Sequence, residues 1–261
     1  MADTATEDLL RRGEMTVQGR LVSASNATFF ARLALDGAES DCVYKPVRGE
    51  RPLWDFPDGT LAGREVASYV VSELAGWHLV PPTVMADGPF GPGMVQQWVD
   101  EPLETVLVDI VPVDAVPAGW MHVLDAVDQH GDPVALVHAD HPALRSLAVF
   151  DVVVNNADRK GGHVLVDAAG TVSGCDHGVT LHVEDKLRTV LWGWAGRPLT
   201  DHDAAALERL MAALEDSTDV LAEHITRSEV LQMRRRAARL LRTRLHPLPT
   251  RGSAVIPWPA F

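Results

Sequence analysis

The chain has little cysteine and no long hydrophobic run. Its 261 residues include two cysteines, Cys42 and Cys175, too few for a disulfide scaffold. No apolar run approaches the roughly 20 residues that a membrane-spanning helix needs. The first eight residues are acidic and lack the apolar core of a signal peptide. These features predict a protein of the reducing cytoplasm with no integral membrane segment.

Positive charge is also scarce. The 23 Lys and Arg residues face 36 Asp and Glu residues, which gives a formal net charge of -13. An acidic protein repels nucleic-acid phosphates and anionic lipid surfaces, so we expect no nucleic-acid partner and no electrostatic docking on membranes. The hydrophobic content of 46% is that of an ordinary globular protein with a substantial core.

Lysine occurs at only three positions, Lys45, Lys160 and Lys186, whereas the chain has 20 arginines. The two side chains differ in shape and hydration, so a chain that uses arginine so heavily can retain lysine where arginine does not serve. Chance is the alternative, since three residues must lie somewhere. The three lysine positions are therefore worth inspecting for a functional role.

The first hundred residues predict a small sheet and two helices. A short amphipathic helix is expected over 7–14. Apolar residues at helical spacing predict a second helix over 60–75, which Gly76 ends. Alternating apolar residues predict strands within 15–35 and at 41–46, 80–84 and 93–99.

Helices dominate the second half of the chain. A convincing helix over 142–154 leads into Asn155. A strand pair is expected at 164–166 and 172–175, followed by helices at 199–214 and 228–245 and an irregular stretch over 247–261. Residues 100–140 are rich in Val, Asp and Pro and are compatible with a hairpin or with short helices. The layout is a sheet-rich half followed by a mainly helical half.

Two aspartates stand on predicted neighbouring loops. Asp158 follows the helix over 142–154 in a loop with glycines, His163 comes five residues later, and Asp176 follows the predicted strand pair. Phosphoryl transfer needs one group to orient the nucleophile and accept its proton, and others to hold metal and nucleotide phosphates. Two aspartates on adjacent loops can divide these roles.

The first half supplies a complementary charge. Lys45 lies on a predicted strand, and Glu65 lies 20 residues later on the following helix, where it can pair with Lys45. The polar turn around Ser23, Ser25 and Asn26 can present backbone N–H groups to phosphate. The order of turn, lysine, glutamate and two aspartates is more specific than any one of these residues.

Residues 156–163 (Asn-Ala-Asp-Arg-Lys-Gly-Gly-His) resemble the Asn-x-Asp-Arg-x-x-x-Asn catalytic loop of phosphatidylinositol 3/4-kinase-like and HipA-type kinases. Residues 175–178 (Cys-Asp-His-Gly) resemble their metal-binding Asp-x-Gly segment. Over residues 15–245 the chain resembles an actinobacterial family described as phosphatidylinositol 3/4-kinase-like. The resemblance implies an α+β, two-lobed kinase-like fold with an N-lobe over 1–100 and a C-lobe over 101–261.

The resemblance also implies site residues and cofactors. The catalytic aspartate falls on Asp158, and Arg159 and Lys160 in the same loop are expected to be catalytic residues with it. ATP would bind between the lobes with Mg²⁺ or Mn²⁺. Its phosphates would face Lys45, and Glu65 would hold Lys45 in place through an ion pair. The remaining expectations are Asp176 and His163 as metal ligands, and an adenine-binding strand of Gln96, Gln97, Trp98 and Val99.

This chain departs from the pattern at His163, where the family has asparagine. Asparagine offers an oxygen that suits Mg²⁺, whereas imidazole favours softer ions such as Mn²⁺ or Zn²⁺. His163 can therefore bind Mn²⁺, hydrogen-bond a phosphate, or weaken the site. The turn at 23–28 also lacks the usual glycines.

Structural interpretations stand beside these functional ones. Asp158 and Asp176 suit tight turns, and Lys45 and Glu65 can be solvated charges. His177 is expected to be a turn or core histidine, and Cys42 and Cys175 small buried hydrophobes. The leading prediction is an ATP-dependent kinase with an unknown hydroxyl acceptor in a protein, a small molecule or a lipid. The alternatives are a nucleotide-binding pseudokinase that regulates a protein partner, and a nucleotidyltransferase on the same fold.

Overall fold

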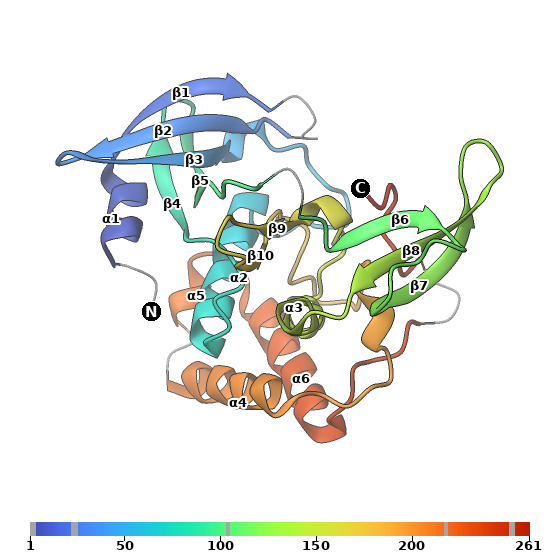
Figure 1. The fold of residues 1–261 in the computed structure, drawn as a ribbon. Coiled ribbons are helices and arrows are strands. Elements are labelled where there is room, and N and C mark those ends of the chain that lie inside the picture. The colour runs from blue at the N-terminus through green and yellow to red at the C-terminus, as the bar shows by residue number, and fades with distance from the viewer. Residues whose placement is uncertain (1–3, 22–25, 103–104, 217–218, 251–253) are drawn as a thin grey trace.

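The computed structural model of the chain describes residues 4–21, 26–102, 105–216, 219–250 and 254–261. A five-stranded sheet built from the first hundred residues is followed by a part that carries most of the helices and two smaller sheets (Figure 1). This is the mixed α/β architecture, with a sheet-rich first part, that the sequence predicts.

The large sheet is antiparallel throughout and has the strand order β1-β2-β3-β5-β4. The predicted strands are present, although β3 begins three residues earlier and β4 three residues later than the pattern indicates. The strand predicted over 93–99 spans 91–97, so Trp98 and Val99 lie just beyond it. Their bounds are β1 Glu14–Arg20, β2 Phe29–Leu35, β3 Ala38–Pro46, β4 Thr83–Gly88 and β5 Gly91–Gln97.

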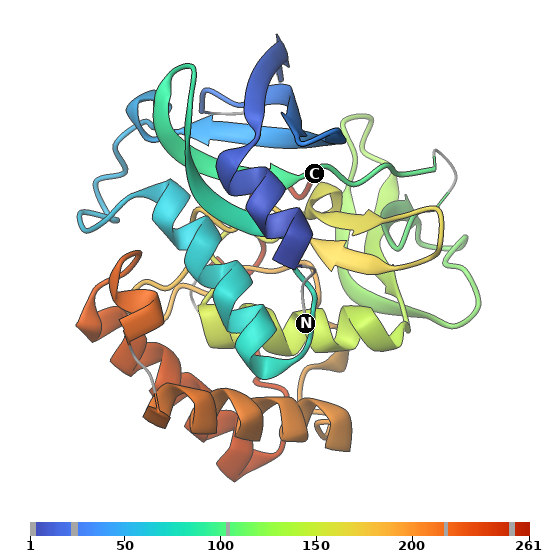
Figure 2. The same ribbon diagram turned by 90° about the vertical axis from the view of Figure 1, so that its left-hand side faces the viewer.

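The two faces of this sheet are covered differently. Helix α1 (Thr4–Arg12) packs its buried Leu9 and Leu10 on the face that carries Cys42 and Tyr44 (Figure 2). Helix α2 (Leu61–Ala75) lies against the opposite face, where Ala62 and Val66 contact Met94. Because strand side chains alternate between faces, Lys45 of β3 points to the α2 side, away from Cys42 and Tyr44.

Local signals set the ends of α2. The hydroxyl of Thr60 accepts a hydrogen bond from the N–H of Gly63 and caps the first turn. Gly76 ends the helix with φ of 70°, a left-handed conformation that glycine adopts at little cost. The sequence predicts both ends.

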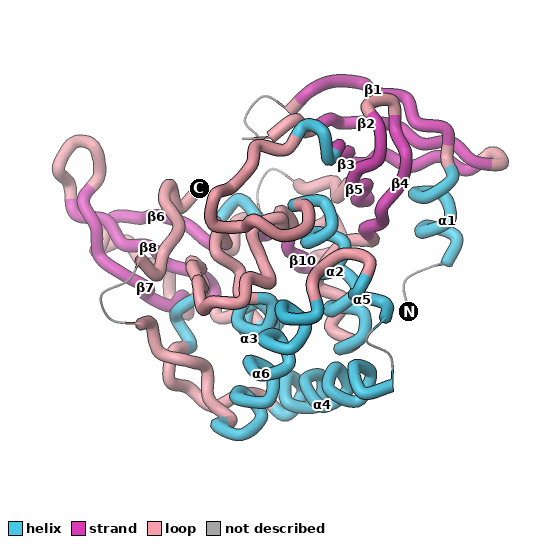
Figure 3. Tube along the Cα trace, turned by 180° about the vertical axis from the view of Figure 1, so that it is seen from behind, coloured by secondary structure: helices cyan, strands magenta, loops and turns pink. Residues whose placement is uncertain are grey.

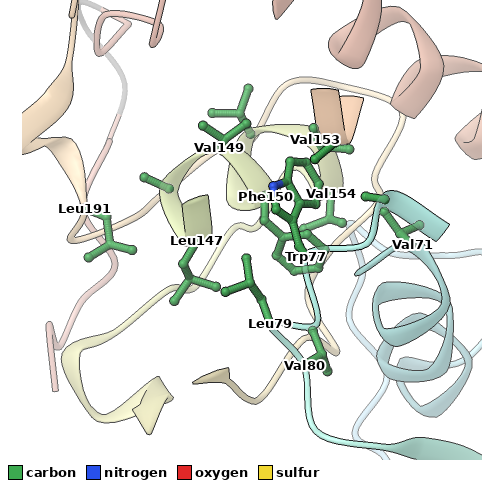
Figure 4. Packing of buried hydrophobic residues seen from close by; sticks show 14 of the residues in the cluster. Val71, Trp77, Leu79, Val80, Leu147, Val149, Phe150, Val153, Val154 and Leu191 are labelled. Carbon is green, nitrogen blue, oxygen red and sulfur yellow. The ribbon is translucent and has the colours of Figure 1, made fainter. Parts of the chain in front are cut away.

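The main hydrophobic core surrounds helix α3 (Pro142–Val154), whose bounds match the prediction. Figure 4 shows Phe150 of α3 against Trp77, with Leu79 and Val154 close by. The Trp77 and Phe150 rings meet edge to face with centroids 5.9 Å apart. The other helices of this part are α4 Asp201–Asp216, α5 Asp219–Ala222 and α6 Arg227–Thr243. None of the described helices combines the length and apolar character that a membrane crossing requires.

The stretch around 100–140, which the sequence leaves open between a hairpin and short helices, forms a three-stranded antiparallel sheet. Its strands are β6 Val108–Pro112, β7 Trp120–Val127 and β8 Pro133–Ala139, in the order β6-β8-β7. The predicted pair is also present, as β9 Val164–Val166 and β10 Val172–Gly174. Three 3-10 turns complete the described structure, at Val47–Gly49, Gly161–His163 and Trp192–Trp194.

Long irregular segments lie between these elements, as the view from behind shows (Figure 3). The run from Cys175 to Leu191 has no described helix or strand, yet Leu181 and Val190 are fully buried within it. This run carries Asp176 and follows the hairpin next to residues 158–163. The fold thus brings the predicted site residues onto irregular segments held by a packed core.

Candidate active site

Lys45 joins three segments that are distant in sequence. Its Nζ atom lies 2.6 Å from Oε1 of Glu65 on α2 and 2.7 Å from Oδ1 of Asp176. Glu65 is 2% exposed and uses its other oxygen, Oε2, to accept the backbone N–H of His177 at 2.8 Å. The predicted Lys45–Glu65 pair is therefore present, and it is tied to the segment that carries Asp176.

The charges of these groups respond to one another. Burial alone would lower the pKa of Lys45, but the negative charges of Asp176 and Glu65 outweigh burial and raise it. The positive charge of Lys45 is the main reason that the pKa of Asp176 is lowered. The pKa of Glu65 is raised because burial disfavours its charged form more than Lys45 stabilises it. Lys45 is thus held as a cation at the junction of the sheet, α2 and the 175–191 run.

The loop after α3 is shaped by two asparagines. Asn155 has φ of 52°, donates hydrogen bonds to the carbonyls of His182 and Glu184, and accepts one from the N–H of Lys186. Asn156 donates to Asp151 and accepts the N–H of Asp158 at 2.9 Å. These amides serve the loop backbone, and the sequence gives them no such role.

Asp158 lies on this loop with a side chain that is 33% exposed. Its Oδ2 is 3.4 Å from Nζ of Lys160. Burial raises the pKa of Asp158, while the charge of Lys160 opposes the rise. A half-buried carboxylate with a raised pKa is suited to accept a proton, because its neutral form is less costly than in water.

Arg159 is placed differently from the catalytic role expected of it. Its side chain is fully buried and forms an ion pair with Asp151 of α3 at 3.0 Å. The guanidinium also donates to the carbonyls of His163 and Cys175, both at 3.0 Å, and lies 2.6 Å from Nε2 of His177. A side chain so enclosed cannot touch a substrate, so we correct its role to one of positioning.

This buried cluster is the part of the site that sequence reasoning misses. Asp151 accepts hydrogen bonds from Asn156, Arg159 and Thr189, and thereby joins α3 to the loop and to the 175–191 run. A signal was available, because Asp151 interrupts the apolar run of α3 between Phe150 and Val152. His177 is the core histidine that the sequence predicts, fully buried and edge-on to Phe150.

His163 lies beside Asp176, with Nε2 3.3 Å from Oδ2. Burial lowers the pKa of His163 to about 4, so its ring is neutral near pH 7. Nδ1 of this ring is buried without a hydrogen-bond partner among the described residues. A neutral imidazole beside a carboxylate is a suitable pair of metal ligands.

The pair fits a catalytic cation bound together with a nucleotide. Mg²⁺ in such sites is held by one or two carboxylates with phosphates and water. Within the described ranges, no three His, Cys, Asp or Glu side chains gather as a metal-ligand group. The pair supplies one carboxylate and one imidazole, and metal binding by Asp176 and His163 stays a prediction.

The residues expected near adenine lie at the end of β5. Gln96 is buried and donates from its amide to the hydroxyl of Thr83 at 2.8 Å. Gln97 donates its backbone N–H to the carbonyl of Pro82, and Trp98 donates its own to Asp41. A cavity of about 380 Å³ is lined in part by Gln97 and Val99. Contact with adenine stays a prediction for these residues.

The predicted phosphate turn is described in part. Ser23 and Ser25 lie outside the described residues. Asn26 accepts the backbone N–H of Arg51 through Oδ1 at 2.9 Å, so its side chain holds the loop after β3. Phosphate binding by this turn stays a prediction.

Comparison with known proteins identifies a relative in sequence and structures of similar fold. No protein-family model matches the chain. Protein Rv2133c of Mycobacterium tuberculosis is 52% identical over 263 residues, which cover 97% of this chain and 94% of that protein.

Among solved structures, the Golgi casein kinase is similar, with a TM-score of 0.50, 14% identity, and coverage of 98% of this chain and 78% of that one. The proinflammatory kinase CtkA of Helicobacter pylori matches with a TM-score of 0.43 and 10% identity, over 90% of this chain and 94% of its own. The Golgi casein kinase match shows that the fold is kinase-like, and at this identity it shows the fold alone. The identity with the mycobacterial protein over nearly the whole of both chains shows that this chain belongs to the family of protein Rv2133c.

Proposed function

We propose that this chain is an ATP-dependent phosphotransferase that acts on a hydroxyl acceptor. The observation that carries the proposal is the convergence of Lys45 with Glu65 and Asp176, at 2.6 and 2.7 Å, from a strand, a helix and a loop. A strand lysine paired with a helix glutamate and facing a metal-binding aspartate is the arrangement with which kinases hold ATP phosphates. The kinase-like fold supports the same function.

The proposal divides the chain as the sequence resemblance implies. Residues 1–100 form a nucleotide-binding lobe and residues 101–261 a catalytic lobe, in a phosphatidylinositol 3/4-kinase-like layout. Lys45 contacts the phosphates, and the strand end from Gln96 to Val99 receives adenine. Asp176 and His163 hold Mg²⁺ or Mn²⁺, which supplies charge neutralisation of the nucleotide phosphates when bound.

Asp158 is the group that receives the acceptor's proton. The acceptor oxygen attacks the γ-phosphorus of ATP while its proton passes to the Asp158 carboxylate. The bond between the γ-phosphorus and the β–γ bridging oxygen breaks, and ADP leaves with that oxygen. Because burial raises the pKa of Asp158, its carboxylate accepts this proton more readily than an exposed carboxylate does.

Only the net charge of the chain helps to choose among the possible classes of acceptor. Kinase-like folds serve proteins, small molecules and lipids, so the fold does not select among them. The net charge of -13 disfavours attachment to an anionic lipid surface. We therefore place a soluble protein or small molecule ahead of a membrane lipid.

The test is transfer of labelled phosphate. The purified chain is incubated with γ-labelled ATP and Mg²⁺ or Mn²⁺, and released phosphate and labelled products are measured. Asp158→Asn is expected to lower turnover by about a hundredfold or more. The control is Asp125→Asn, which changes an aspartate that is 74% exposed on β7. Equal turnover in wild type and Asp158→Asn would remove the assigned catalytic role.

A second candidate is a pseudokinase that binds nucleotide and regulates a partner. His163 stands where the resembled catalytic loop has asparagine, and its ring is largely buried and neutral. An imidazole is a poorer ligand for Mg²⁺ than an amide oxygen, which favours a site that binds nucleotide without turnover. It predicts thermal stabilisation by ATP with no release of phosphate. Mass spectrometry of modified products separates phosphoryl from nucleotidyl transfer, the third possibility on this fold.

A further inference from the structure

Residues 255–261, which we call the 255–261 segment, run along the proposed catalytic loop. The carbonyl of Ala260 accepts the backbone N–H of Gly161 at 2.8 Å, three residues after Asp158. At the other end, the carbonyl of Val255 accepts the N–H of Thr189 at 3.0 Å and Nε1 of Trp192 at 2.9 Å. Figures 1 and 2 both place this end of the chain beside the 3-10 turn at 161–163.

The segment is docked by packing as well as by hydrogen bonds. Pro257 is buried, and Ile256 and Ala260 pack against the main hydrophobic core. Trp258 is 92% exposed, so it contributes little to this docking. The segment thus packs on this part of the fold through Ile256, Pro257 and Ala260, while Phe261 is 47% exposed.

The ring of Phe261 packs directly against the backbone of Gly161, where it leaves no room for a side chain. The backbone at Gly161 is outside the left-handed region, so its conformation does not require glycine. A Cβ atom at this position would lie 2.1 Å from a ring carbon of Phe261. The ring of Phe261 thus occupies the space that a side chain at 161 would need. A side chain at position 161 would therefore require the Phe261 ring to move.

Thr189 links the other end of the segment to the buried cluster. Its backbone N–H donates to Val255, and its hydroxyl donates to Asp151 at 3.0 Å. It also forms an isolated parallel bridge with Arg159, the residue after Asp158. The segment therefore contacts both the loop that carries Asp158 and the backbone at Thr189 that pairs with this loop.

We propose that the 255–261 segment is a positioning element of the transfer site, in which Phe261 and Ala260 fix the backbone of residues 158–163 and so the place of the Asp158 carboxylate. This inference rests on the proposed function. The loop contains the consecutive glycines Gly161 and Gly162, which leave its backbone with wide conformational freedom. Contacts from outside the loop restrict that freedom. Small displacements of a catalytic group cost large factors in rate, so the segment acts on kcat.

The test compares four variants with wild type in ATP turnover. Phe261→Ala removes the ring, and Gly161→Ala displaces it by adding a Cβ. Each is expected to lower kcat by about tenfold while KM for ATP stays within about twofold, because Lys45 and Asp176 are untouched. The double variant is expected to lose no more than the worse single variant, since both act through one contact. Trp258→Ala, in the same segment, is the matched control and keeps wild-type kcat.

A structural readout accompanies the kinetics and does not depend on activity. Amide hydrogen exchange at Gly161 and Thr189 is expected to accelerate when residues 255–261 are deleted, because both amides donate to this segment. Unchanged exchange at both amides would overturn the docking. If the deletion variant does not fold, Phe261→Ala gives the same comparison at Gly161.

The outcomes separate this inference from the proposed function. Wild-type turnover with unchanged kcat in Phe261→Ala and Gly161→Ala overturns the positioning role and leaves the kinase proposal standing. A rise in kcat in these variants also overturns it, because the segment would then be an inhibitory cover. If wild type neither binds nor turns over ATP, the proposed function fails and the inference fails with it.

Discussion

Arg159 and Asp151 form an ion pair in which both side chains are fully buried and the charged groups lie 3.0 Å apart. Through this pair, the residue after Asp158 is anchored to α3. The guanidinium reaches onward to the carbonyls of His163 and Cys175. The guanidinium of Arg159 thus ties the loop that carries Asp158 and His163 to the segment that carries Asp176.

Breaking this pair is expected to be costly. Asp151→Asn leaves the Arg159 charge buried without a counter-charge, and the free energy of unfolding should fall by about 3–5 kcal/mol. The measurement is urea-induced unfolding followed by circular dichroism. Arg32→Gln breaks the exposed pair between Arg32 and Asp41 and should leave the free energy of unfolding close to that of wild type. Similar losses in the two variants would contradict the anchoring role of Asp151.

Lys45 and Lys186 provide a matched pair of lysines for testing the site. Lys45→Met should lower ATP turnover by about a hundredfold, because a cation facing the phosphates is lost. Lys186 pairs with Asp55 at 2.9 Å, away from Asp176, and Lys186→Met should turn over ATP at close to the wild-type rate. Initial rates at saturating ATP make the comparison. Equal losses in both variants would argue that Lys45 acts through stability alone.

The two cysteines are expected to be unreactive in the folded protein. Burial raises the pKa of Cys42 and of Cys175 to about 12 each, so neither thiol forms much thiolate near neutral pH. Titration with a disulfide reagent at pH 7.5 should detect almost no thiol in the native protein and both thiols in guanidinium chloride. Cys42 is buried and Cys175 is half-buried, so rapid labelling of Cys42 in the native protein would contradict its placement.

His246 predicts a pH dependence of stability. Burial and the nearby charge of Arg145 lower the pKa of this histidine from 6.5 to about 4. Between these pH values the unfolded chain binds a proton at His246 and the folded chain does not. Stability therefore falls as pH falls through this window, by roughly 3 kcal/mol in total from this residue.

Urea unfolding of wild type and His246→Gln at several pH values between 7.5 and 4 measures the contribution of His246 to the pH dependence of stability. The free energy of unfolding should fall less steeply with decreasing pH in the variant, which cannot titrate at this position. Parallel curves for the two proteins would mean that His246 does not contribute to the pH dependence.

Much of the fold follows from local patterns. The helix over 142–154 and the helix that Thr60 and Gly76 bound are predicted because capping and apolar spacing are encoded within a few residues. The β6-β8-β7 sheet is predicted only in part, because a hairpin is one of the two alternatives for this stretch and β7 and β8 form one. The pairing of β6 with β8, and not with β7 next to it in sequence, is not predicted. Pairing of this kind depends on partners that a local window does not contain.

The site likewise contains residues that the sequence predicts and residues that it does not. Lys45, Glu65 and Asp176 could be proposed from their order, since each belongs to a segment of recognisable type, and the structure brings them together. The contact between Gly161 and Phe261 joins residues a hundred positions apart with no motif to connect them. The positioning role of Arg159 likewise depends on burial, which neither its position in the motif nor its charge indicates.

Transfer of the γ-phosphate is the most direct test of the central claim. We predict that the wild-type chain releases or transfers labelled phosphate from ATP in the presence of Mg²⁺ or Mn²⁺. Asp158→Asn should abolish this turnover while still being thermally stabilised by ATP, because Lys45 and Asp176 remain in place. Absence of phosphate release and transfer in the wild-type chain, or turnover unchanged in Asp158→Asn, would contradict the account.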